Sequence, residues 1–348
     1  MIPNIEHMYF NEHTLLKLGN YNQSLQKIIF PSSLLTIDAG NMFNQSLDDV
    51  KLPINLINII FGDMFNRSLN KANLPNNLQV ITFGYNFNKP IHKIDFPSNL
   101  QQITFGNNFN KSLKDVHFPS SLHTIIFGSS FNRPLDKVIF PPSLKVLTFG
   151  SSFNQVFKLP ENLQSITFGY WYTHALHDII FPTSLQNITL DGFSAHNLDK
   201  VTFPPNLKTI NFGTRFNQTL TNINLPASIQ SITFGSKFNQ PLDQTTLPSN
   251  LQILIFGYDF NQSLDTITFP HTLQTIEFGQ GYTKSLNNLP STIEKLIFHS
   301  INMDIVNLPC SLKQIQIKYN ITSSIKKILK IPYGCVILDI NNNIIKIE

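Results

Sequence analysis

The chain has 348 residues, of which 41% are hydrophobic and only 13% are charged, with 25 basic and 21 acidic side chains. The hydrophobic share is enough for a continuous core, and the nearly balanced charge, spread along the chain, argues against a nucleic-acid partner. No apolar run approaches the roughly 18 residues of a membrane span, and no basic segment followed by an apolar one marks a secretory signal. With only two cysteines, Cys310 and Cys335, we expect a protein of the cytoplasm or nucleus that is not secreted and does not contact a membrane.

One unit recurs along most of the chain and reads P-x-x-L-x-x-I-x-F-G-x-x-F-N-x-x-L-x-x-I-x-F. Its prolines are 22 residues apart at Pro31, Pro53, Pro75, Pro97, Pro119 and Pro141, and again, after one short step, at Pro182, Pro204, Pro226, Pro248 and Pro270. A fixed period of this length predicts one stack of repeats in place of separate globular domains.

The pattern Leu-x-x-Ile-x-Phe occurs twice in each unit and predicts short strands with one buried face. One copy ends at glycine, as in residues 100–106, and the other ends at proline, as in residues 113–119. Glycine or proline interrupts the chain too often for regular helices. We therefore expect an all-β solenoid, a right-handed coil of about fourteen 22-residue turns with two parallel β-sheets on opposite sides and few or no helices.

The two ends of the chain depart from the repeat. Residues 1–13 precede the first copy and are expected to form an N-terminal cap, and the repeats occupy residues 14–317. Residues 318–348 alternate around Asn341-Asn342-Asn343 and are expected to form a C-terminal β cap, because the last strands of a solenoid need cover. A docking tail is the alternative.

Phe-Asn stands at one fixed point in each unit. Its phenylalanines are expected to stack as a spine in the core, where their burial is favourable. Its asparagine amides carry both donors and an acceptor and are expected to satisfy backbone groups within their own turn. This structural ladder contains Asn44, Asn66, Asn88, Asn110, Asn132, Asn154, Asn217, Asn239 and Asn261. An exposed recognition stripe of Phe-Asn pairs is the alternative.

The positions between these fixed residues vary, and those after the leucine of the proline-ended copy are often charged. The candidate partner-binding residues in this column are Lys71, Lys93, Asp115, Lys137, Asp178 and Lys200. Opposite charges one turn apart could simply pair with each other. A partner surface is the other interpretation, since solenoids bind along extended faces.

An irregular region between residues 153 and 200 is either a second site or a bend in the coil. The step from Pro141 to Pro160 lacks three residues, and the copies that follow lose Phe-Asn. The candidate partner-binding residues here are Tyr170, Trp171, Tyr172 and His174, because Trp and Tyr are enriched at binding hot spots. In the alternative, Tyr172 replaces the usual core phenylalanine.

Residues able to carry chemistry are sparse. His174, His177 and His196 could be considered as metal ligands, but H-x-x-H without a nearby cysteine is a weak signal. The glycine of each unit does not belong to a phosphate-binding loop, and no nucleophile motif is present. We expect no metal, no cofactor and no enzymatic activity.

The unit resembles the FNIP repeat, a leucine-rich-repeat relative found mainly in amoebae and giant DNA viruses. The resemblance rests on Phe-Asn-Lys-Pro at Phe87, Phe-Asn-Arg-Pro at Phe131 and Phe-Asn-Gln-Pro at Phe238, and it covers roughly residues 14–317. The literal tetrapeptide Phe-Asn-Ile-Pro is absent. The resemblance implies a leucine-rich-repeat-like solenoid and supplies no catalytic residues.

Some members of that family carry an F-box or a kinase domain beside the repeats. We expect neither here, because the residues before Leu15 are too few for an F-box. The expected function is a non-catalytic protein–protein interaction scaffold, such as a target-recognition module, with a protein partner of unknown identity. The alternatives are a structural component that self-associates end to end, for example in a particle, and more remotely a substrate receptor that joins a ubiquitin ligase through a separate adaptor.

Overall fold

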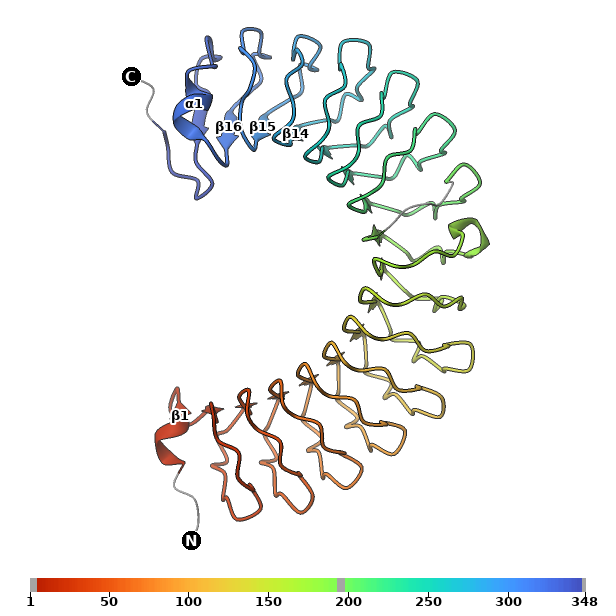
Figure 1. Ribbon diagram of the computed structural model, residues 1–348, viewed down its shortest axis with the longest axis vertical. Coiled ribbons are helices and arrows are strands. Elements are labelled where there is room, and N and C mark those ends of the chain that lie inside the picture. The colour runs from red at the N-terminus through yellow and green to blue at the C-terminus, as the bar shows by residue number, and fades with distance from the viewer. Residues whose placement is uncertain (1–4, 193–197, 346–348) are drawn as a thin grey trace. The chain divides into compact units, whose positions relative to one another are not determined.

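The computed structural model describes residues 5–192 and 198–345. The chain divides into two compact units, unit 1 (Met1–His174) and unit 2 (Ala175–Glu348). Within each unit the chain winds into stacked turns, and each turn contributes one short strand to a sheet (Figure 1). The predicted β-solenoid of about fourteen turns, spaced by about 22 residues and with almost no helix, is confirmed.

Unit 1 contains a 3-10 helix followed by short strands. They are η1 (Glu6–Met8), β1 (Tyr9–Phe10), β2 (Leu15–Lys17), β3 (Thr36–Asp38), β4 (Asn58–Ile60), β5 (Val80–Thr82), β6 (Gln102–Thr104), β7 (Thr124–Ile126), β8 (Val146–Thr148) and β9 (Ser165–Phe168). From β2 to β9 each strand pairs in parallel with the next. Ile81 lies opposite Ile103, and Ile103 opposite Ile125. This register places the inward isoleucines in one buried column, since side chains alternate along a strand.

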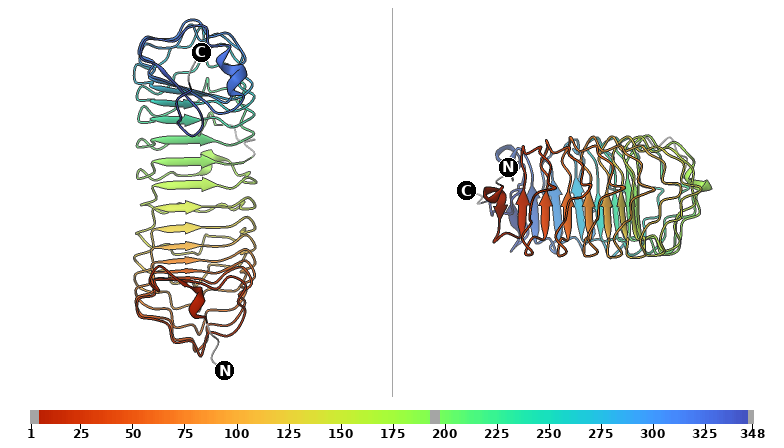
Figure 2. Two further views of the ribbon diagram at one scale, coloured as in Figure 1. Left: turned by 90° about the vertical axis from the view of Figure 1, so that its left-hand side faces the viewer. Right: turned by 90° about the horizontal axis from the view of Figure 1, so that it is seen from below.

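Unit 2 repeats the arrangement and adds one short α-helix. Its elements are η2 (Leu176–Asp178), β10 (Asn187–Leu190), β11 (Thr209–Phe212), β12 (Ser231–Thr233), β13 (Ile253–Ile255), β14 (Thr275–Phe278), β15 (Lys295–Phe298), β16 (Gln314–Ile317), α1 (Ile321–Ile325) and β17 (Val336–Leu338). The strands from β10 to β17 pair in parallel, each with the next (Figure 2).

Three β-turns close a regular turn of the coil. In the copy that contains β6, the hydrogen bonds run from Leu100 N–H to Pro97 O, from Phe109 N–H to Gly106 O and from Val116 N–H to Leu113 O. We call these the proline, glycine and leucine corners. The strand side lies between the proline and glycine corners, the Phe-Asn side between the glycine and leucine corners, and the Ile-x-Phe side between the leucine corner and the next proline corner.

The expected second sheet does not form on the Ile-x-Phe side. Apart from an isolated bridge between Ile305 and Ile328, the described residues of this side pair with no neighbouring turn. The leucine corner takes up the first half of the predicted strand. The remaining segments are also too far apart, because ring centroids of the phenylalanines before proline are 6.2–6.3 Å apart in unit 1, whereas paired strands lie about 4.8 Å apart. Proline then removes one backbone donor.

The core of each unit is built on two interleaved columns of phenylalanine. In unit 1 the rings that end the strands are 5.3–5.6 Å apart, and the rings of Phe-Asn are 6.0–6.2 Å apart. The Phe-Asn phenylalanines are buried, for example Phe109 and Phe131 at 0% exposure. The predicted spine of stacked rings is therefore confirmed. Because spacing grows from the strand side to the Ile-x-Phe side, the turns of unit 1 fan apart away from the sheet.

The glycine that follows most of the strands allows neighbouring turns to touch through their backbones. A Cβ atom at Gly106 would lie 1.8 Å from the backbone oxygen of Gly84, and one at Gly128 would lie 2.3 Å from that of Gly106. No side chain fits in such contacts. The glycine of the repeat is thus required by close approach between turns, in addition to its place at a corner.

Both terminal segments cover an edge of a sheet. At the N-terminal end β1 pairs antiparallel with β2, with Tyr9 opposite Leu16. At the C-terminal end β17 continues the parallel register, and a hairpin turn brings Ile344 back against Leu338. Hydrogen bonds from the side chain and backbone of Asn343 hold the pKa of Asp339, in that turn, below its usual value. The boundaries of the two caps remain predictions.

Candidate functional site

The asparagine column of the Phe-Asn side forms hydrogen bonds from turn to turn. Each Oδ1 accepts the backbone N–H of the asparagine one turn later at 2.9–3.1 Å. The bonded residues are Asn44, Asn66, Asn88, Asn110, Asn132 and Asn154 in unit 1, and Asn217, Asn239 and Asn261 in unit 2. The prediction that each asparagine bonds backbone within its own turn is wrong. The backbone N–H groups at the three corners already donate within the β-turns, whereas the backbone N–H of each ladder asparagine faces the preceding turn and needs an acceptor there.

The ladder also continues where Phe-Asn is missing. In unit 1 the N–H of Thr173 donates to Asn154 Oδ1 at 2.9 Å, and Tyr172 stacks on Phe153 with ring centroids 6.3 Å apart. In unit 2 the N–H of Thr283 donates to Asn261 Oδ1 at 2.9 Å. Tyr-Thr therefore takes the structural place of Phe-Asn.

A second ladder, which the sequence analysis missed, runs along the proline corner. The residue two positions after proline donates to a backbone oxygen of the preceding turn, as Ser121 Oγ does to Leu100 O at 2.6 Å and Asn55 Nδ2 to Ser32 O at 2.9 Å. Serine, threonine or asparagine at this position in most copies was the available signal. Both ladders satisfy backbone groups that the turns leave unpaired.

The predicted charged column lies at the leucine corner and is accessible. Its members Lys71, Lys93, Asp115 and Lys137 in unit 1, and Asp178 and Lys200 in unit 2, are all exposed. The four residues of unit 1 form no ion pair with any residue that the structure describes, so charge pairing between turns does not explain them. Asp178 lies 3.6 Å from the Nε2 atom of His177.

The predicted partner-binding residues of the irregular region differ in their exposure to solvent. Trp171 is 53% exposed and its ring meets that of Tyr170 edge-on at 4.9 Å, while the His174 ring lies 3.3 Å from Asn154 O. Tyr172 is only 4% exposed. Its assignment as a partner-binding residue is therefore wrong, because it fills the position of the core phenylalanine.

The Ile-x-Phe side of unit 1 is hollowed around an exposed isoleucine. Ile139 is 84% exposed and lies between two cavities. One, of about 570 Å³, reaches from Leu135 to Asn162 across the step that lacks three residues. The other, of about 390 Å³, is lined by residues between Asp115 and Pro142. These hollows lie where neighbouring turns are not joined by strand pairing.

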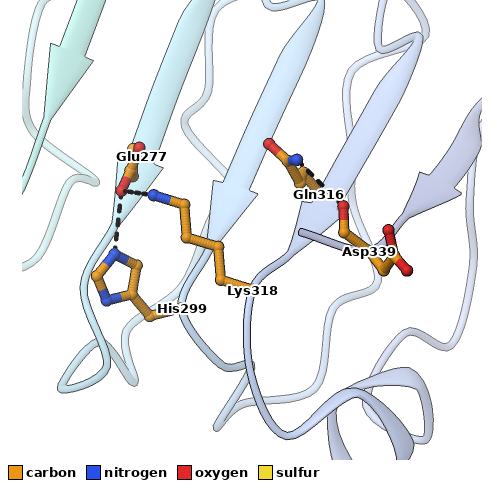
Figure 3. A network of polar contacts seen from close by, with 5 residues as sticks. All are labelled: Glu277, His299, Gln316, Lys318 and Asp339. Atoms are coloured by element: carbon orange, nitrogen blue, oxygen red, sulfur yellow. Dashed lines mark hydrogen bonds and ion pairs between the residues drawn. The ribbon is translucent and has the colours of Figure 1, made fainter. Parts of the chain in front are cut away.

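The strand side of unit 2 carries a charged network that the sequence analysis also missed (Figure 3). Glu277 of β14 accepts a hydrogen bond from His299 Nε2 at 3.0 Å and one from Lys318 Nζ at 2.6 Å. Beside them Gln316 Nε2 donates to Asp339 O at 3.1 Å. The only signal was Glu277 itself, in a column that holds threonine in several other turns. The network ties together the turns that carry β14, β15 and β16.

The described residues contain neither a metal-ligand cluster nor a membrane-spanning helix. They contain no group of three His, Cys, Asp or Glu side chains that could hold a metal ion. His196 lies outside the described residues, so the arrangement of the three histidines considered above is not tested. Among the described helices, none has the length and apolar character needed to cross a bilayer.

A stack of turns held by two polar ladders and a phenylalanine spine agrees with the sequence family that the chain matches. The model of the FNIP repeat matches residues 43–86, 87–130, 131–158, 153–192, 193–237 and 238–281. The chain belongs to the FNIP repeat family. A comparison with curated proteins found no match.

A solved structure shows that this FNIP repeat protein has a fold of the leucine-rich-repeat (LRR) type. It is similar to CroV588, described as a novel circular LRR protein, with 26% identity and a TM-score of 0.57, over 90% of this chain and 57% of CroV588. The chain thus spans little more than half the length of that relative. It also matches the leucine-rich effector YopM of Yersinia pestis, with 19% identity and a TM-score of 0.47, over 93% of this chain and 87% of YopM. An LRR-like solenoid is a fold typical of protein-interaction scaffolds.

Proposed function

We propose that this FNIP repeat protein is a non-catalytic scaffold that holds another protein on the exposed columns of its solenoid. The observation that carries the proposal is the contrast between its fixed and variable positions. The asparagine and proline-corner ladders satisfy the backbone internally, whereas Lys71, Lys93 and Lys137 are exposed and make no ion pair with a described residue. Exposed charges that the frame does not use are available to a partner.

End-to-end self-assembly is the less favoured function. Such assembly through strand pairing needs an open sheet edge. The described edges carry antiparallel cover, from Tyr9 and Phe10 on β2 and from Ile344 on β17. These contacts support a scaffold that does not polymerise through its strands.

We also propose a reducing compartment, the cytoplasm or the nucleus. Cys310 is exposed, Cys335 is buried, and both are free thiols. Burial raises the pKa of the Cys335 thiol, which makes it less reactive. Biotinylation of intact cells is compared with biotinylation of lysed cells. Labelling of the protein only after lysis would support the proposal, and labelling on intact cells would indicate an extracellular location.

The test of the scaffold combines oligomeric state with capture of a partner. Size-exclusion chromatography with light scattering is expected to show a single non-polymeric species. A pull-down is then repeated after charge reversal at Lys71, Lys93 and Lys137, with reversal at the exposed Lys208, Lys284 and Lys326 of unit 2 as a control. Loss of one specific partner only in the first variant supports the scaffold. Growth into polymers, or capture that depends on residues 1–13 alone, supports self-assembly.

A further inference from the structure

Basic side chains of successive turns lie next to one another on the Phe-Asn side of unit 1. The position after the ladder asparagine is Arg67, Lys89, Lys111 and Arg133 in four consecutive turns, and the leucine corner of these turns adds Lys71, Lys93, Lys114 and Lys137. We call these eight residues the basic stripe. Along the chain they are interspersed with acidic residues, but within residues 66–71, 88–93, 110–115 and 132–137 only Asp115 and Asp136 are acidic.

The frame of the coil does not require this charge. The Nε atoms of Arg67 and Arg133 donate to the asparagine carbonyl one turn earlier at 2.9 and 3.0 Å. Gln45 and Gln262 make the same bond through Nε2 at 3.1 Å. A neutral glutamine is thus sufficient to make this hydrogen bond. The basic side chains of successive turns repel one another, and the hydrogen bond does not need their charge.

Against the eight basic side chains of the stripe, the same segments hold only two acidic ones, Asp115 and Asp136. None of its eight side chains forms an ion pair with a described residue. The stripe ends at Asp48 and Asp49 on one side and at the neutral Gln155 on the other. In unit 2 the corresponding residues 217–222, 239–244 and 261–266 contain no lysine or arginine. Other turns of unit 2 carry single basic residues at these positions, Lys200 at a leucine corner and Lys284 after Thr283, so the run of four consecutive turns with two basic residues each is particular to the stripe.

The spacing of the stripe indicates what it binds. The adjoining Phe65, Phe87, Phe109 and Phe131 rings are 6.0–6.1 Å apart, so the stripe is about 18 Å long. Alternate residues of an extended peptide are about 6.6 Å apart. We propose that the basic stripe binds an extended acidic segment of a partner protein, with carboxylates at alternate residues facing successive turns. The inference rests on the proposed scaffold function and names the chemistry of its partner.

Nucleic acid and membrane fit the stripe less well. Proteins that bind single strands add exposed aromatic rings on which bases stack, but the phenylalanines beneath the stripe are buried at 0% exposure. Membrane-bound surfaces usually insert large apolar side chains. The column between the basic positions contains Ser68, Pro90, Ser112 and Pro134, and none of these is a large apolar residue.

The test measures binding of labelled peptides to the full chain by fluorescence anisotropy. One peptide of about eight residues alternates Glu and Ser, and a second has the same composition with its Glu residues in one block. The alternating peptide is expected to bind at least about threefold more tightly, with affinity that falls as salt rises from about 20 to 150 mM. K89E/K111E is expected to weaken binding at least about tenfold, because it removes two attractions and adds two repulsions.

The matched control is K208E/K284E, which makes the same charge change in unit 2 and is expected to alter affinity less than twofold. Equal binding of the two peptides, or an unchanged affinity of K89E/K111E, would overturn the proposal. Tighter binding of a single-stranded oligonucleotide, or of phosphatidylserine vesicles, would overturn it as well. A specific partner whose capture survives K89E/K111E would refute the stripe but leave the scaffold function standing, whereas the absence of any partner would refute the scaffold.

Discussion

Asn110 shows how one residue joins three turns of this protein through its backbone and its side chain. Its own N–H donates to Asn88 Oδ1 at 3.0 Å, and its Oδ1 accepts the N–H of Asn132 at 3.1 Å. Its carbonyl accepts the Arg133 side chain. The residue is half-buried, so the backbone groups that it satisfies have limited access to water. The Phe-Asn motif is therefore part of the frame, and recognition depends on the residues around it.

Replacement of Asn110 tests the ladder at one position. Asn110→Ala is expected to lower the free energy of unfolding by about 1–2 kcal/mol, because the N–H of Asn132 loses its acceptor. Urea denaturation followed by circular dichroism measures the change. Asn110→Asp keeps an acceptor oxygen and is expected to lose less. An equal loss in both variants would contradict the role of Oδ1.

Tyr282 is expected to make the free energy of unfolding fall as pH rises in the alkaline range. It stacks on Phe260 in the phenylalanine column and its hydroxyl donates to Ser285 O at 3.0 Å. Burial, and to a lesser degree the charge of Asp265, raises the pKa of Tyr282. Because the folded state favours the neutral phenol, its stabilising contribution is complete below the unfolded pKa of about 10 and is lost as pH rises above it.

Tyr282→Phe should separate the hydrogen bond from the titration. At pH 7 the variant is expected to lose about 1 kcal/mol of unfolding free energy with the hydroxyl bond. Above about pH 10 its stability should decline less steeply than that of the parent, because phenylalanine cannot ionise. Urea midpoints measured from pH 7 to about 11 give the comparison. Parallel pH curves would show that Tyr282 does not cause the decline.

At the scale of one turn, local turn chemistry decides between strand and corner. The sequence pattern Leu-x-x-Ile-x-Phe is the same in both halves of the unit, and so it predicted two sheets. In one copy of the proline-ended half, Ser112 precedes the leucine and its Oγ accepts the N–H of Lys114 at 3.1 Å. This bond favours a turn at the leucine corner. The sequence alone did not reveal this, because serine also precedes the leucine of the glycine-ended half, where Ser121 and Ser143 donate to the preceding turn instead.

The glycine corner can be tested by adding one methyl group. Gly106→Ala is expected to cost about 3 kcal/mol or more, because its Cβ would overlap the backbone of Gly84 and force the two turns apart. Thermal unfolding measures the loss. Ser130→Ala at the glycine corner adds no atom and is expected to change stability by less than about 0.5 kcal/mol. A small loss in Gly106→Ala would mean that the turns can separate without cost.

The sites were less predictable than the fold. The charged leucine corner followed from the alternation of fixed and variable positions, and Lys71, Lys93 and Lys137 are exposed as the pattern suggested. Tyr172 was ambiguous because aromatic enrichment is a signal of both cores and hot spots. The contact of Glu277 with Lys318 joins residues 41 positions apart across shortened turns, where the 22-residue period no longer indicates which residues meet.

At the scale of the whole molecule, we expect the covered sheet edges to prevent association through the strands. Removal of residues 1–13 takes β1 away from β2 and exposes the backbone of Leu15–Lys17. We expect concentration-dependent aggregation of this variant in light scattering. Removal of residues 1–8 retains Tyr9 and Phe10 and should leave the protein monodisperse. If both truncated chains stay monodisperse, β1 does not protect the edge.

Proximity labelling in the cell that makes this protein tests most directly whether its exposed charges hold another protein. The full chain, K89E/K111E and K208E/K284E are compared after matching their expression and thermal unfolding. We predict that the parent and K208E/K284E label the same small set of proteins, including one with an acidic segment of alternating carboxylates, and that K89E/K111E no longer labels it. A chain that labels no protein above background in any form would contradict the scaffold account.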